Sequence, residues 1–139
     1  MFPAEVFLSH SSADSAMAQR LAATLSNHGI PVFFGPQNII GAQQWQNEIL
    51  QALRRCDWFV VLLSPDAIQS MWVKREVAYA LRDSRYEDRI VPLQYKPCDL
   101  ESLEWLTLYQ MINFDGDFAT GCRDLLRIWG IGLREEFLL

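Results

Sequence analysis

The chain has 139 residues, of which 50% are hydrophobic and 21% charged, and its formal net charge is −5 at pH 7. This length allows one domain with a full core, so we expect residues 1–139 to be a single domain, either a small protein or a module of a longer chain. The acidic balance and the scattered basic residues disfavour nucleic acid as a direct partner, because that binding needs clustered Lys and Arg.

No apolar run approaches the roughly 20 residues of a membrane span, and the first residues lack the basic start of a signal peptide. We therefore expect a cytoplasmic protein that does not contact a membrane. Cys56, Cys98 and Cys122 are odd in number and show no CxxC pairing, which predicts buried thiols. His10 and His28 have no partners at metal-ligand spacing, so no metal site is expected.

The first elements alternate between strand and helix. Residues 5–9 predict a short strand, and the S-x-x-D pattern from Ser11 to Asp14 indicates a capped helix start. Apolar residues at every fourth position predict a helix over 15–27, which Gly29 ends. Residues 31–34 predict a second strand that begins with a proline, where a missing N–H does least harm.

The middle of the chain begins with a predicted surface loop over 35–43, which is marked by glycine and proline. A predicted helix over 44–55 follows, with one apolar face. Residues 58–63 are an unbroken apolar run, as in a parallel strand that helices cover on both faces.

The second half continues the alternation. We expect a helix over 68–83, a strand over 89–93, a weaker helix over 100–108, a strand over 111–114 and a helix over 118–129. Pro92 lies late in its strand, which indicates an edge strand or a bulge there.

This alternation predicts an α/β fold, a five-stranded parallel sheet with helices on both faces and the flavodoxin-like order 2-1-3-4-5. Ligands of such sheets bind at the carboxyl ends of the strands, where the winding reverses. The site is therefore expected between the first and third strands, at residues 9–14 and 64–72.

Three segments carry a family resemblance. Residues 7–14 (FLSHSSAD) resemble the first strand and polar turn of prokaryotic Toll/interleukin-receptor (TIR) domains. The block VVLLSP at 60–65, followed by Ser70, Trp72 and Glu76, is similar to that family in spacing and in residue type. Gly41 and Trp45 resemble the family's loop and the helix after it, although the segment lacks the acidic residue and the Pro-Gly of many relatives.

The resemblance implies an enzyme that cleaves NAD between nicotinamide and ribose, giving ADP-ribose or a cyclic isomer, with NAD as substrate and no cofactor. It places the catalytic glutamate at Glu76. Trp72 lies four residues earlier and so on the same side of a helix. The further residues that it implies as substrate-binding are Ser9, His10, Ser11, Phe33, Phe34, Trp45, Ser64 and Ser70.

The resemblance also implies partners and a biological role. TIR domains associate head to tail, and the prokaryotic ones often accompany a sensor domain in anti-phage immune signalling. Three alternatives remain at this point. They are a non-catalytic TIR adaptor module, a nucleoside deoxyribosyltransferase-like enzyme, and a receiver domain, which would need acidic residues where this chain has Ser9 and Ser64.

Overall fold

A parallel five-stranded sheet forms the centre of the molecule. The computed structural model describes residues 2–35 and 42–138, without the side chains of residues 42–45. The strand order is β2-β1-β3-β4-β5, which confirms the predicted fold. The strands are β1 (Val6–Ser9), β2 (Val32–Phe33), β3 (Trp58–Leu63), β4 (Ile90–Gln94) and β5 (Ile112–Asn113).

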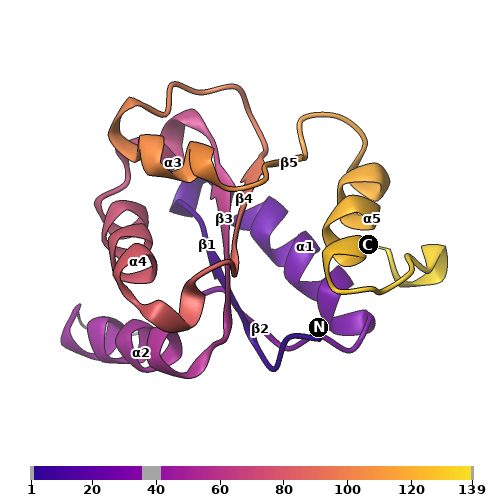
Figure 1. Cartoon of the computed structure of the whole chain (residues 1–139), viewed down its shortest axis with the longest axis horizontal. Helices are drawn as coiled ribbons and strands as arrows, with labels where there is room; N and C mark the ends of the chain where they lie inside the picture. Colours follow the sequence, from indigo (N-terminus) through magenta and orange to yellow (C-terminus); the bar gives the residue numbers. More distant parts are fainter. Residues whose placement is uncertain (1, 36–41, 139) are drawn as a thin grey trace.

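Helices cover both faces of this sheet (Figure 1). On one face lie α1 (Ser15–Asn27) and α5 (Phe118–Ile128), and on the other lie α2 (Ala42–Arg55) and α4 (Met71–Arg82). The remaining short helices are η1 (Ser12–Asp14), α3 (Pro65–Gln69), η2 (Ser84–Tyr86), η3 (Glu101–Leu108) and η4 (Glu135–Phe137).

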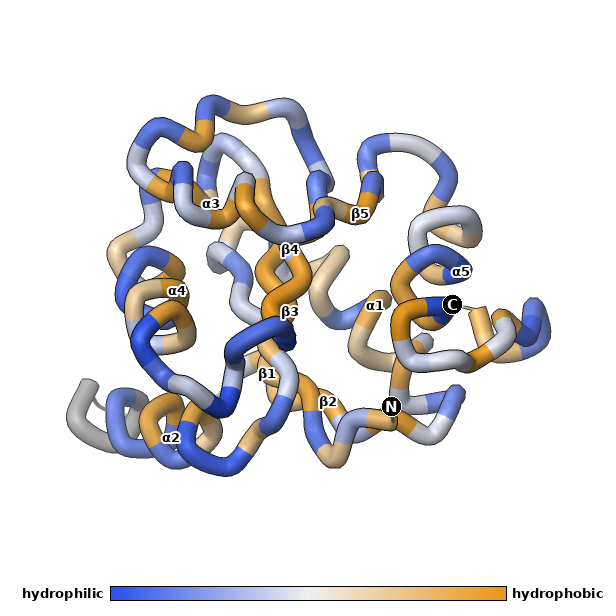
Figure 2. The backbone as a smooth tube through the Cα atoms, in the orientation of Figure 1, coloured by the Kyte–Doolittle hydropathy of each residue, from blue (hydrophilic) through white to orange (hydrophobic). Residues whose placement is uncertain are grey.

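The apolar run of β3 explains the two-sided core. Trp58, Val60 and Leu62 pack in the cluster with α1 and α5. Their neighbours Phe59, Val61 and Leu63 pack in the cluster with α2 and α4. Successive side chains of a strand point to opposite faces, so all six positions are buried and the centre of the sheet is continuously hydrophobic (Figure 2).

The predicted end of the first helix is confirmed at Gly29. Its φ of 87° lies in the left-handed region, which a residue with a Cβ adopts only at a cost. The next amide, from Ile30, donates back to the Leu25 carbonyl at 3.0 Å and closes the helix end.

The single helix predicted over 68–83 is wrong, because two helices, α3 and α4, meet at Ser70. Ser70 has an extended backbone, with φ −76° and ψ 121°, and its side chain accepts a hydrogen bond from the Val73 amide at 3.2 Å. Ser64 caps α3 in the same way, accepting from the Ala67 amide at 3.0 Å. Each serine thus begins its own helix, and the periodicity of the apolar residues alone does not reveal this break.

Other differences are local. The segment 100–108 is a 3-10 helix from Glu101 onward, and the helix predicted from residue 44 begins at Ala42. The edge strand or bulge predicted at Pro92 is also wrong, because β4 lies between β3 and β5 in an unbroken register. The β4–β5 pairing starts at Leu93, so Pro92 has no β5 residue opposite it. Residues 36–41 of the predicted loop lie outside the described residues.

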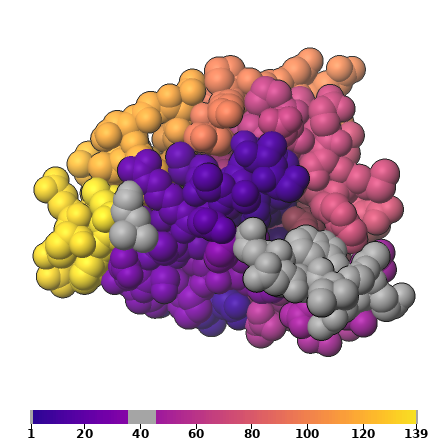
Figure 3. All heavy atoms as spheres, turned by 180° about the vertical axis from the view of Figure 1, so that it is seen from behind, coloured from indigo at the N-terminus to yellow at the C-terminus, as the bar shows by residue number. Residues whose placement is uncertain are grey.

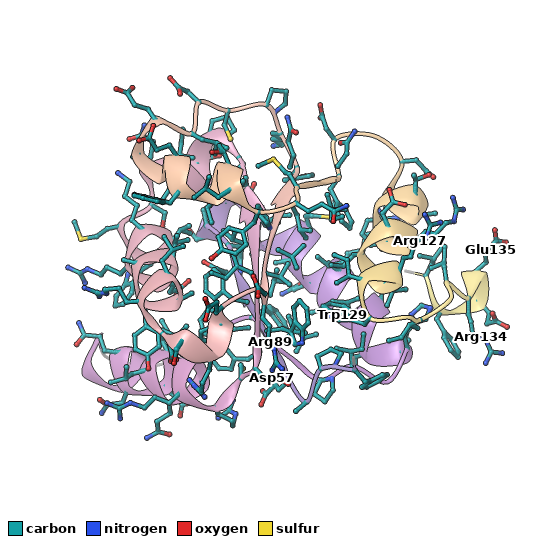
Figure 4. All side chains as sticks on the ribbon, in the orientation of Figure 1. Asp57, Arg89, Arg127, Trp129, Arg134 and Glu135 are labelled. Carbon is teal, nitrogen blue, oxygen red and sulfur yellow. The ribbon has the colours of Figure 1, made fainter. Side chains whose placement is uncertain are left out.

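The amino ends of the strands are joined by the chain's own polar groups. The Asp57 carboxylate accepts hydrogen bonds from the amides of Ala4 and Glu5, each at 3.1 Å. Arg89, before β4, forms an ion pair with Asp57 at 3.9 Å (Figure 4). Trp58 packs edge-on against Trp129, with 5.7 Å between the ring centroids.

Cys56 and Cys122 are buried free thiols as predicted, whereas Cys98 is only half-buried, on the connection after β4. Over the described residues, no helix is long and apolar enough to cross a bilayer.

Candidate functional site

A cleft of about 280 Å³ lies at the carboxyl end of β1, between the turn that follows it and α4. The turn after β1 contacts α3, and β1 itself contacts α4. Figure 3 shows the N-terminal part of the chain, in indigo, beside these later segments on this side of the molecule. The cleft is lined by Phe7, Leu8, His10, Ser12, Ser15, Phe33, Phe34, Gly35, Ile49, Ser70, Trp72 and Glu76. Its walls are therefore mainly apolar, with a single carboxyl group.

Glu76 is the acidic group of the cleft. Its side chain projects from α4 toward β1, and the residue is only 7% exposed. The Ser9 hydroxyl donates a hydrogen bond to Oε1 of Glu76 at 2.6 Å. Burial raises the pKa of Glu76 to about 7, while the hydrogen bond from Ser9 acts in the opposite direction. The carboxyl can therefore lose or take up a proton near neutral pH.

Trp72 lines the same cleft one helical turn before Glu76. The indole is half-buried and packs on the core cluster between the sheet and α4. The guanidinium carbon of Arg75 lies 5.5 Å from the centre of the Trp72 ring system. Because α4 begins at the Ser70 cap, the two side chains leave the helix in a fixed direction toward the cleft.

His10 and two phenylalanines form the wall near β1 and β2. Burial lowers the pKa of His10, so its imidazole is neutral at neutral pH. The ring centre of His10 lies 6.3 Å from that of Phe34. Phe33 packs on Phe7 at 5.3 Å between ring centres, so two pairs of contacting rings line this part of the cleft.

A second buried carboxyl, that of Asp14, lies behind this wall and does not line the cleft. The Ser11 hydroxyl donates to Oδ2 of Asp14 at 3.1 Å, and the Ser64 hydroxyl donates to the same oxygen. Ser64 in turn accepts the Ala67 amide. These bonds join the turn after β1 to the start of α3.

Within the described ranges 2–35 and 42–138, no three or more His, Cys, Asp or Glu residues are grouped so that they could hold a metal ion. Glu76, Trp72 and the aromatic wall form a mainly apolar pocket with one acidic group among the described residues, an arrangement that suits a ligand with a flat ring and developing positive charge.

Comparison with known sequences decides the family, because the model of the TIR domain family matches residues 6–126. The chain belongs to the TIR domain family. No curated protein sequence matches this TIR domain.

Solved structures agree with the fold of the TIR domain. The TIR domain of the Toll-related receptor TRR-2 from Hydra magnipapillata is 18% identical, with a TM-score of 0.72 over 88% of this chain and 95% of the other. The TIR domains of the activated Roq1 resistosome, which directly recognizes the pathogen effector XopQ, are 15% identical, with a TM-score of 0.69 over 90% of this chain and 98% of the other. At these identities the likeness concerns the fold alone.

The TIR domain brings together most of the residues singled out from its sequence. Those that line the cleft are Glu76, Trp72, His10, Phe33, Phe34 and Ser70. Ser9 lies behind the lining and contacts Glu76 instead. The prediction for Trp45 concerns a side chain outside the described part of the structure.

Ser11 and Ser64 were predicted to bind substrate, but neither lines the cleft, because both hydroxyls are directed to Asp14. The predicted S-x-x-D cap is wrong. Neither Ser11 nor Asp14 makes a side-chain cap bond to a helix amide, since the two side chains bond to each other.

The sequence did not indicate the cleft positions of Ser12 and Ser15, nor the buried role of Asp14. All three lie on or just after the turn that was expected at the site. The signal available was the strand-end position of that turn, which shows where polar residues gather but not which of them point outward.

Proposed function

We propose that this TIR domain cleaves NAD at the bond between nicotinamide and ribose. The products are nicotinamide and either ADP-ribose, when water attacks C1′, or a cyclic form of it, when an atom of the same molecule takes the place of water. The observation that carries the proposal is the Glu76 carboxyl, buried in a cleft and next to Trp72. Burying a carboxyl group is costly, and Glu76 combines this burial with a place in the lining of the cleft, where the carboxyl can meet a ligand.

The chemistry accounts for the residue types. When the C1′–N bond breaks, its electron pair leaves with nicotinamide, which becomes neutral, and the ribose develops oxocarbenium character. The ionised carboxylate of Glu76 stabilises that charge or holds a ribose hydroxyl, as carboxylates do in glycoside hydrolysis. In hydrolysis, water supplies the new oxygen on C1′ and releases one proton.

The aromatic groups bind the nicotinamide end of the substrate. Trp72 stacks on the cationic pyridinium, an interaction worth on the order of 1 to 2 kcal/mol when water is excluded. Phe33, Phe34 and the neutral imidazole of His10 form the opposite wall. Ser70 lines the cleft near the start of α4 and offers a hydroxyl to the ligand.

The test is incubation of concentrated protein with NAD, with nicotinamide followed by chromatography. We expect Glu76→Gln to lower the rate by at least about a hundredfold, equal to about 3 kcal/mol of transition-state stabilisation. Glu87→Gln is the matched control, because Glu87 is exposed and distant from the cleft lining. Equal turnover by wild type and Glu76→Gln would remove Glu76 from the mechanism.

We further propose that head-to-tail association with other TIR domains completes the site, in immune signalling that in a prokaryote would be anti-phage defence triggered by a sensor domain. The Roq1 TIR domains, which are part of a resistosome that recognizes a pathogen effector, support such a setting. The rate per subunit should then rise with protein concentration. A rate strictly proportional to concentration would contradict assembly, and self-association with intact NAD would favour the adaptor role.

A further inference from the structure

Ser9 is the last residue of β1, and its hydroxyl is directed to Glu76. The residue is 1% exposed and does not line the cleft. Its one side-chain hydrogen bond in the described part of the chain is the 2.6 Å bond donated to Oε1 of Glu76, 67 residues further along. The hydroxyl therefore serves the glutamate and not the substrate directly.

Among the described residues, Ser9 is the one polar side chain with a hydrogen bond to Glu76. The strand β3 beneath it carries only apolar residues. The titratable groups on the elements packed around α4 are His10 and Asp14 after β1, Glu48, Arg54 and Arg55 on α2, Asp66 on α3, Lys74, Arg75, Tyr79 and Arg82 on α4, and Asp83, Arg85 and Tyr86 around η2. Over residues 2–35 and 42–138, none of them forms a hydrogen bond or ion pair with Glu76.

We propose that Ser9 is a positioning residue, which holds Oε1 of Glu76 through its hydroxyl and leaves Oε2 free to face the ribose of the substrate. This inference rests on the proposed NAD cleavage, because it assigns the glutamate's second oxygen to the reacting sugar. In the described part of the chain Oε2 has no hydrogen-bond partner, while Glu76 lines the cleft.

The bond has two physical consequences. A hydroxyl that donates to a carboxylate stabilises the ionised form, so Ser9 keeps Glu76 charged at a lower pH than burial alone would allow. The bond also fixes the orientation of a side chain that otherwise rotates freely about its last torsion. Loss of the hydroxyl should therefore raise the pKa of Glu76 and loosen its direction.

The titration of Glu76 tests this without any substrate. The probe is ¹³C NMR of glutamate carboxyl groups in the labelled chain, with the Glu76 signal assigned by its absence in Glu76→Gln. We expect Ser9→Ala to move the Glu76 midpoint upward by about one pH unit, since the hydroxyl stabilises the ionised carboxylate more than the protonated form. Ser9→Thr keeps a hydroxyl and should titrate close to wild type.

Ser11→Ala is the matched control. Ser11 is a buried serine two residues away that donates to a different carboxyl, that of Asp14, so its loss should leave the Glu76 midpoint unchanged. The inference is overturned if Ser9→Ala titrates like wild type, or if Ser9→Thr shifts as far as Ser9→Ala. In the second case, packing and not the hydroxyl would set the midpoint.

The rate profile of NAD cleavage gives the second readout. At pH 7 the Ser9→Ala rate should fall about fivefold further than at pH 9, where the carboxyl is ionised with or without the hydroxyl. A merely structural serine would lower the rate by the same factor at every pH, and that result would overturn the inference. If the titration shifts as expected but wild type cleaves no NAD, the hydrogen bond stands and the proposed function fails.

Discussion

Two buried carboxyl groups lie near the carboxyl end of β1, and they differ in what surrounds them. Asp14 is 3% exposed and receives two serine hydroxyls on one oxygen, away from the cleft. Glu76 is 7% exposed, receives one serine hydroxyl, and lines the cleft. The carboxyl of Asp14 joins the turn after β1 to the start of α3. The carboxyl of Glu76 has one oxygen bonded to Ser9, and it lines the cleft, where it can contact a ligand. Burial alone therefore does not identify a functional acid, and the partners of both oxygens must be counted.

The largest effect on stability is expected at Asp14. Asp14→Ala leaves the buried hydroxyls of Ser11 and Ser64 without their acceptor, which should lower the free energy of unfolding by about 3 kcal/mol. Urea denaturation measures this change. Asp115→Ala is the control, since Asp115 is exposed and its removal should cost less than about 0.5 kcal/mol. Equal urea midpoints for Asp14→Ala and Asp115→Ala would show that the buried carboxyl of Asp14 does not stabilise the fold.

The second carboxyl, that of Glu76, should make the free energy of unfolding fall as the pH rises. Because its pKa is raised to about 7 in the folded state, the folded protein binds more protons than the unfolded chain between the two pKa values. The contribution of Glu76 is thus fully present below the unfolded pKa near 4.5 and is lost as the pH rises through about 7. Between pH 5 and pH 8 this amounts to about 2 kcal/mol.

Comparison with Glu76→Gln isolates this contribution. The variant has no proton to lose, so urea denaturation should show it gaining on wild type by about 2 kcal/mol from pH 5 to pH 8. The hydroxyl of Ser9 can still donate to the amide oxygen, which keeps the fold intact. Parallel curves for the two proteins over this range would show that Glu76 titrates normally.

The aromatic side of the cleft should matter for binding more than for folding. Trp72→Ala should lower kcat/KM for NAD about tenfold, because the stacking contact is worth about 1 to 2 kcal/mol. Trp72→Phe keeps a smaller ring, so its kcat/KM should lie between those of wild type and Trp72→Ala. Trp105→Ala is the control, since that tryptophan is 66% exposed on η3 and does not line the cleft. A loss as large in the control would show that the effect is not local to the cleft.

The sheet could be predicted from the sequence because its signals are strong and local. The six apolar residues of β3 and the turn at Gly29 each allow one structure, and both predictions hold. The break at Ser70 was missed, because a helix that stops and restarts keeps nearly the same apolar period. The continuity of β4 through Pro92 depends on where β5 begins to pair, which the strand's own residues do not encode.

The site could be predicted only in part. The four-residue spacing of Trp72 and Glu76 predicted that both lie on the same side of a helix, and both line the cleft. The direction of each serine could not be predicted, since Ser9, Ser11 and Ser64 have equivalent hydroxyls. Each bonds to a buried carboxyl, and which carboxyl it meets depends on the packing of β1 against α4 and of η1 against α3.

The smallest expected effect concerns the two serine caps and refines the same comparison. Ser64 caps α3 and also donates to Asp14, whereas the side-chain bond of Ser70 is to the Val73 amide alone. Ser70→Ala should therefore lower the free energy of unfolding by only about 1 kcal/mol, the usual cost of a lost cap. Ser64→Ala should cost more, because a carboxyl partner is lost with the cap.

Ser70→Asp separates the cap from the rest of the side chain. Aspartate caps helices as well as serine does, so this variant should unfold close to wild type in urea. If Ser70→Ala lowered the free energy of unfolding as much as Ser64→Ala, the start of α4 would depend on more than one hydrogen bond. The orientation of Trp72 and Glu76 would then be set by this junction as a whole and not by the cap.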